Sequence, residues 1–138
     1  MSATTMQSIL PTTIGRGWSR ALGVAGAVLA AVAVWAVAVP VLGISLLIRF
    51  GNSAPQGVGL PAVVGGSLVL SLLGLGLLVA LEKLSANARA IWTSVAAVAL
   101  AASLGLPLVA ATTQATMGAL ALMHVAAAGV LIPVLRRR

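Results

Sequence analysis

Residues 60–81 read "LPAVVGGSLVLSLLGLGLLVAL", a run of apolar and small residues without a charged side chain. An α-helix rises about 1.5 Å per residue and a bilayer core is about 30 Å thick, so about 20 apolar residues suffice to cross it. The run ends at "EKLSANAR", residues 82–89, where charged residues appear. This stretch therefore predicts a transmembrane helix.

Three further apolar segments, at about 21–39, 90–106 and 114–135, have a similar length. Of the 138 residues, 61% are hydrophobic and 7% are charged, whereas soluble domains carry about 25% charged residues. A chain with so few polar side chains cannot cover a globule in water. We therefore expect one all-α membrane domain at residues 16–138, after a flexible tail at residues 1–15. Its four transmembrane helices are expected at about 19–40, 60–83, 89–107 and 113–135.

The stretch between the first two helices has two interpretations. Residues 41–50, "VLGISLLIRF", are apolar apart from Ser45 and Arg49, and a cluster of turn formers, "NSAPQG", follows them. The first helix could continue past Pro40 by two turns. We favour an outer loop with a short extended or hairpin-like segment lying against the bundle, on a weak alternation between Ile44 and Arg49.

The basic residues indicate the orientation of the bundle. The formal net charge is +7, but the charges lie at the ends of apolar runs and do not cluster with aromatic residues as in a nucleic-acid interface. With four crossings, both termini and the link between the second and third helices share one side. Every basic residue except Arg49 lies there: Arg16, Arg20, Lys83, Arg89, Arg136, Arg137 and Arg138. Because cytoplasmic loops are enriched in Lys and Arg, we expect a multi-pass cell-membrane protein with both termini in the cytoplasm.

Residues 1–38 also have an alternative interpretation, a secretory signal in which Arg16 and Arg20 precede an apolar stretch ending in "AVA". We expect an uncleaved first crossing. Trp18, close to Arg20, and Trp92, close to Arg89, are predicted to anchor their helices at the membrane interface.

Small residues should hold the helices together, because in lipid the hydrophobic effect does not press helices against one another. They recur at spacings of three and four, which places them on one stripe of each helix. The stripes are Gly23, Gly26 and Ala30 in the first helix, Ser67, Ser71 and Gly74 in the second, and Ala96, Ala99 and Ser103 in the third. They predict close helix packing.

His124 is the only histidine, and the helical rise places it near the bilayer midplane. An imidazole facing hydrocarbon leaves polar atoms unpaired, so we expect the ring to be uncharged and buried toward the second or third helix. Its expected partner is Ser71, Ser103 or a carbonyl freed near Pro107. The residue has either a structural role or a ligand-binding one.

Two segments, "LEKLSANARAIWTSVAAVALAASLGLPL" at 81–108 and "LALMHVAAAGVLIPVLRR" at 120–137, carry a family resemblance. The features are Trp92 soon after an arginine, a helix break at "SLGLP", and Met123-His124 before Ile132-Pro133. The sequence resembles an uncharacterised family of small four-helix membrane proteins found mainly in actinobacteria, a domain of unknown function. The resemblance implies the fold and no activity.

Residues for enzyme chemistry are missing from the sequence. There is no cysteine, no nucleophile elbow, no phosphate-binding loop, no pair of carboxylates and no metal-ligand cluster. The single acid, Glu82, is expected to pair with Lys83 or Arg89. We therefore predict a non-enzymatic protein without cofactor that associates with itself or serves as an accessory subunit of a larger membrane complex.

The alternative is a small transporter, or a binder of a lipid or isoprenoid-type molecule, that uses a cleft near His124. Ser71, Ser103 and Trp35 are the further candidate residues for this site.

Overall fold

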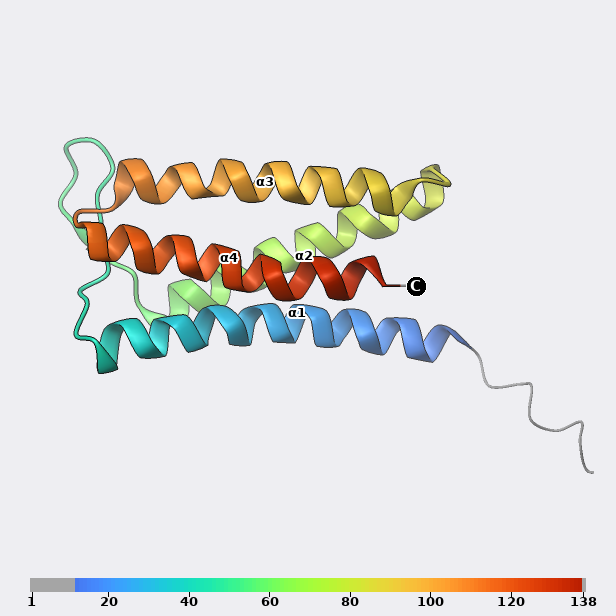
Figure 1. Cartoon of the computed structure of the whole chain (residues 1–138), viewed down its shortest axis with the longest axis horizontal. Helices are drawn as coiled ribbons and strands as arrows, with labels where there is room; N and C mark the ends of the chain where they lie inside the picture. Colours follow the sequence, from blue (N-terminus) through green and yellow to red (C-terminus); the bar gives the residue numbers. More distant parts are fainter. Residues whose placement is uncertain (1–11, 138) are drawn as a thin grey trace, which may run out of the picture.

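The computed structural model describes residues 12–137 and has four long helices lying lengthwise beside one another (Figure 1). They are α1 (Thr12–Ala36), α2 (Leu60–Leu84), α3 (Ala88–Ala110) and α4 (Gln114–Arg136). Each is long and apolar enough to cross a membrane. The chain is therefore an all-α, four-helix membrane protein, as its apolar runs predict.

Two predicted boundaries need correction. The polar tail was expected to reach residue 15, but α1 begins at Thr12, since a helix continues beyond the apolar run when no proline interrupts it. The other predicted tail residues, 1–11, lie outside the described part of the chain.

The predicted break at "SLGLP" is absent as well, because α3 runs through Pro107 to Ala110. A proline inside a transmembrane helix removes one hydrogen bond, and neighbouring groups can compensate for it.

The helices form a ring in which α1 packs on α2 and α4, and α3 packs on α2 and α4. The diagonal pair α2 and α4 makes few contacts. In Figure 1, α2 crosses the bundle obliquely, from beside α1 at its start to beside α3 at its end.

The seam between α1 and α4 depends on glycine. A Cβ atom at Gly26 would lie 2.9 Å from Cγ1 of Val130, and one at Gly23 would lie 2.9 Å from Cγ1 of Val134. Ala27, the residue after Gly26, is fully buried. The small-residue stripe predicted for the first helix therefore does bring two helices into close contact.

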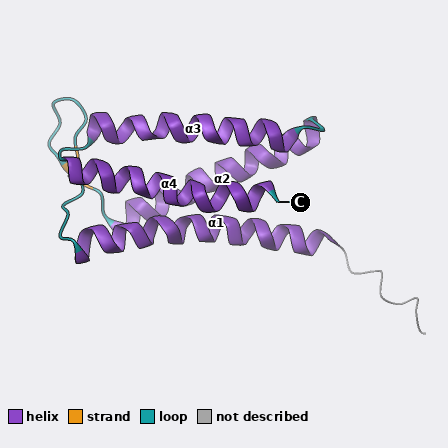
Figure 2. Cartoon of the chain, viewed as in Figure 1, coloured by secondary structure: helices purple, strands orange, loops and turns teal. Residues whose placement is uncertain are grey.

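The chain between α1 and α2 forms a docked hairpin. α1 continues as one π-helical turn, η1 (Val37–Val41), and then β1 (Leu47–Ile48) pairs antiparallel with β2 (Gln56–Gly57). Figure 2 shows these strands in orange at the end of the bundle opposite the C-terminus.

Three hydrogen bonds fasten this hairpin to the helices. Trp35 Nε1 donates to the Val58 carbonyl over 3.1 Å, and Thr116 Oγ1 donates to the Ser45 carbonyl over 3.0 Å. The amide of Arg49 donates to the Ala110 carbonyl over 2.8 Å. The hairpin therefore contacts the ends of α1, α3 and α4.

The opposite end of the bundle carries a cluster of charges, where α1 begins, α2 meets α3 and α4 ends (Figure 1). Glu82 accepts a hydrogen bond from Arg20 over 2.5 Å and lies 3.8 Å from a guanidinium nitrogen of Arg89. The predicted pairing with Arg89 is confirmed. The partner Arg20 was not predicted, because it lies 62 positions before Glu82 in the sequence and only the packing of α1 on α2 brings the two together. Arg138 and the side chain of Arg16 lie outside the described part.

Candidate functional site: a cleft between α2, α3 and α4

A cavity of about 500 Å³ lies between α2, α3 and α4, with Ala31 of α1 and Val58 also contributing to its wall. We call it the cleft. It lies where α2 and α4, the diagonal pair of the ring, make few contacts with each other. Its volume falls within the range of about 300–1,000 Å³ that is typical of small-molecule sites.

The cleft is lined by the small residues that were predicted to pack closely. These are Ser67, Ser71 and Gly74 of α2, and Ala96, Ala99 and Ser103 of α3. A Cβ atom added at Gly74 would come no closer than 3.9 Å to a neighbouring side chain, that of Leu131. The two stripes therefore line a space and do not form one continuous close contact, although Gly74 itself is in contact with neighbouring helices, through Leu131 and through the bond from Trp92 to its carbonyl.

The cleft opens on the side of the bundle, between α2 and α3. Leu70 and Leu73 line it and are 61% and 65% exposed, and Val95 on α3 is exposed as well. This surface faces lipid when the helices span a bilayer. An apolar molecule could therefore enter sideways from the membrane.

Trp92 forms part of the cleft wall where α2 and α3 are joined. It is 2% exposed, and its Nε1 donates to the carbonyl oxygen of Gly74 over 2.7 Å. This burial does not fit the interfacial anchor that was expected from its neighbour Arg89. An indole N–H inside a bundle requires an acceptor, and Gly74 exposes one because it has no side chain. Trp18, by contrast, is 67% exposed and can serve as an anchor.

Trp35 does not line the cleft. Its ring packs near Ala31 and Ala38, and its N–H is used by the Val58 carbonyl. The structure therefore separates it from the other three candidate site residues, because α1 turns this face toward the hairpin.

His124 lines the cleft and is half-buried, on the side of α4 that faces α2 and α3. Its Nδ1 lies 2.7 Å from the carbonyl oxygen of Leu120, on the preceding turn of the same helix. None of the expected partners takes this bond, because the carbonyl four residues earlier on the same helix is within reach of the ring. A carbonyl only accepts, so Nδ1 carries the proton in this contact. In the neutral form of the ring, Nε2 is then an unprotonated acceptor.

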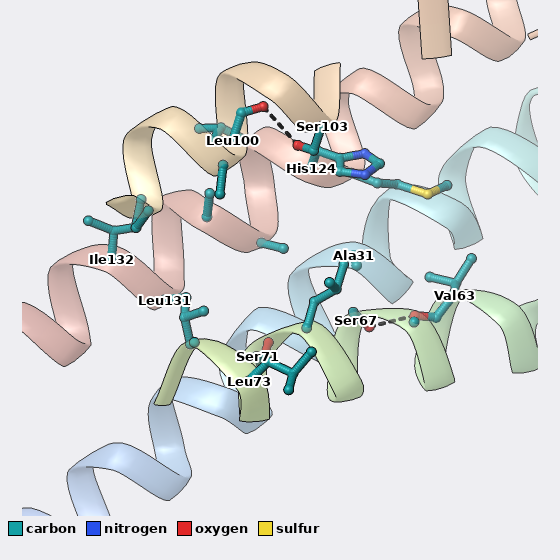
Figure 3. A pocket seen from close by; sticks show the side chains of 18 of the residues that line it. Ala31, Val63, Ser67, Ser71, Leu73, Leu100, Ser103, His124, Leu131 and Ile132 are labelled. Atoms are coloured by element: carbon teal, nitrogen blue, oxygen red, sulfur yellow. Dashed lines mark hydrogen bonds between the residues drawn. The ribbon is translucent and has the colours of Figure 1, made fainter. Parts of the chain in front are cut away.

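The serines of the cleft differ in their bonding. Ser67 and Ser103 donate to carbonyls of their own helices, those of Val63 and Leu100. Ser71 is only 3% exposed, and no hydrogen bond of its hydroxyl is found among the described residues. Figure 3 shows its oxygen on the side of α2 that faces the cleft. No fully buried side-chain nitrogen or oxygen of the described residues lacks a partner, so the Ser71 oxygen keeps some exposure, and the space beside it is the cleft.

Residues 12–138 match a protein family described as "Family of unknown function (DUF6069)". The chain belongs to this family. The match includes all four helices and every residue of the cleft. No curated protein and no solved structure matches the chain.

In this DUF6069 member, the main site residue that was not predicted is Trp92, which was assigned to the membrane interface. The sequence does contain a signal for its position. Trp92 precedes Ala96, Ala99 and Ser103 at spacings of four, three and four, so it continues the stripe of α3 that lines the cleft.

Proposed function

We propose that this protein is a non-enzymatic, multi-pass protein of the cell membrane that binds a lipid or isoprenoid-type molecule in the cleft. The observation that carries the proposal is Ser71, a residue only 3% exposed whose hydroxyl has no hydrogen bond among the described residues and keeps its remaining exposure at an apolar cavity of about 500 Å³. Polar groups in a membrane protein require partners, because hydrocarbon supplies none. A molecule with an apolar body and a polar group would satisfy Ser71.

The lateral opening supports this class of ligand. A molecule dissolved in the bilayer reaches the cleft between Leu70 and Val95 without passing through water. We infer from the basic end of the bundle that both termini are cytoplasmic, which places the hairpin on the outer side. From the resemblance of residues 81–137, we expect an actinobacterial source.

Lipid mass spectrometry on the purified protein tests the proposal. We expect one lipid class to co-purify in near-equal amount with the protein, enriched over the surrounding membrane. Ala99→Phe places a ring in the cleft and should remove that lipid. Ala101→Phe is the matched control, because Ala101 is exposed on the same helix and does not line the cleft. The same lipid content in both variants would contradict the proposal.

A second proposed role is association with other helices, either as a homo-oligomer or as an accessory subunit of a larger membrane complex. The outer face of α2 supports it. Gly65, Val69, Leu72 and Gly76 follow one another at spacings of four, three and four, all are exposed, and a Cβ atom at either glycine would meet nothing within 4 Å. Such a stripe allows close approach of another helix in lipid.

Native mass spectrometry of the solubilised protein tests this second role. We expect an oligomer or a co-purified partner subunit, and its loss in Gly65→Leu. Gly118→Leu on α4 is the control, since Gly118 is equally open. A monomer without a partner would count against association and leave the lipid proposal unaffected.

A further inference from the structure

The hydrogen-bonding groups of the cleft are unusual because almost all of their protons are already used. Of the described residues, those that line the cleft with a polar side-chain atom are Ser67, Ser71, Trp92, Ser103 and His124. All except Ser71 donate to a backbone carbonyl. A hydroxyl and an uncharged imidazole each carry one proton. What Ser67, Ser103 and His124 present to the cleft is therefore lone pairs, while the donor-only Trp92 offers nothing further.

Nε2 of His124 is the strongest acceptor in this set. The bond from Nδ1 to the Leu120 carbonyl holds the ring in the tautomer that leaves Nε2 unprotonated. The serine oxygens are weaker acceptors, since a hydroxyl is far less basic than an imidazole. Ser71 is the single side chain that keeps a proton to donate, and it lies on α2, on the other side of the space (Figure 3).

Because the cleft offers mainly hydrogen-bond acceptors, it distinguishes neutral ligands that carry a donor from those that carry only acceptors. An ester, a ketone or an ether brings only further acceptors, which would leave Nε2 without a donor in a cleft lined mostly by apolar side chains. A cation would bring donors, but its charge would have no acid beside it, because Glu82 does not line the cleft. A hydroxyl group brings a donor without a charge.

Resting on the lipid-binding function proposed above, we infer that the ligand is a lipophilic alcohol whose O–H donates to Nε2 of His124. The rest of the molecule is apolar, because the cleft continues past His124 along Leu131, Ile132 and Leu77. His124 is ten residues from the start of α4, a rise of about 15 Å. The hydroxyl is thus held near the bilayer midplane, well below the headgroups.

A competition experiment separates this inference from the function on which it rests. The purified protein in detergent receives equal concentrations of farnesol and farnesyl methyl ether, and native mass spectrometry measures the ratio of the two complexes. The ether keeps the isoprenoid chain and the oxygen but lacks the proton. We expect farnesol to be favoured about tenfold, the value of one hydrogen bond to a buried acceptor.

Two variants locate the acceptor. In His124→Leu the preference for farnesol should fall to nearly one while the ether still binds. Leu122→Ala should keep the full preference, because Leu122 is exposed on α4 and does not line the cleft.

The outcomes are distinguishable. Equal binding of both probes by the unmodified protein would overturn the alcohol inference and leave lipid binding intact, whereas binding of neither would contradict lipid binding itself. A preference that survives in a folded His124→Leu protein would overturn the assignment to His124. The comparison on the unmodified protein needs no variant, so it decides the alcohol inference even if His124→Leu does not fold.

Discussion

The indole N–H of Trp92 donates to the carbonyl oxygen of Gly74 over 2.7 Å and so joins α3 directly to α2. Beside this bond, Leu78 is fully buried in the same apolar cluster as Trp92 and Leu135. The two helices are therefore held together near the charged end of the bundle. The cleft occupies the space between them and α4 on the other side of this contact.

Trp92→Phe tests how much this bond contributes. The variant keeps an aromatic ring but lacks the N–H, and we expect the free energy of unfolding to fall by about 1 kcal/mol, as for other interhelical hydrogen bonds in lipid. Circular dichroism during titration of mixed micelles with SDS measures it. Trp18→Phe, at an exposed site, should change nothing, and equal effects in the two variants would contradict a special role for the Gly74 bond.

Gly26→Ala tests the seam between α1 and α4. Its Cβ would lie 2.9 Å from Cγ1 of Val130, so either the Val130 side chain or one of the helices must shift, and we expect a loss of about 1–3 kcal/mol. Adding Val130→Ala should recover part of that loss, because it removes the atom that clashes. Gly65→Ala, where nothing lies within 4 Å, should be neutral or slightly stabilising. The same unfolding titration measures all three, and an additive double variant would argue against the contact.

Glu82→Gln tests the charged cluster. It removes the ion pairs with Arg20 and Arg89, but the three side chains are 24%, 28% and 32% exposed for Arg20, Glu82 and Arg89. Exposed ion pairs are worth about 1 kcal/mol or less, so we expect a loss below that value, and a smaller one at high salt. Lys83→Gln serves as the comparison. A loss of several kcal/mol would show that the cluster is shielded from water.

Cysteine labelling tests the orientation, and it is simple here because the natural sequence contains no cysteine. Asn52→Cys lies in the hairpin and Ala86→Cys lies between α2 and α3, both at exposed positions. A membrane-impermeant maleimide should label Asn52→Cys in intact cells. It should label Ala86→Cys only after the membrane is opened. The reverse pattern would place the termini outside.

The four helices were predictable because a bilayer requires apolar runs of a set length, and the sequence contains four of them. Their ends were less predictable. Pro107 indicated a break that α3 does not have, since surrounding helices tolerate the missing hydrogen bond. The bond from His124 to Leu120 was also missed, although it lies within one helix, because nothing in the local sequence says which rotamer the ring adopts.

By itself the sequence determined that the chain spans a membrane with four helices and that its basic residues gather at one end, because both follow from hydropathy and from the order of charges along the chain. Only the tertiary structure decided what the small residues do. A stripe of Gly, Ala and Ser permits close approach, but the tilt of the partner helix decides whether it occurs. Gly26 meets Val130 across the α1–α4 seam, whereas Ser71 and Ala99 line the cleft because α2 crosses the bundle obliquely.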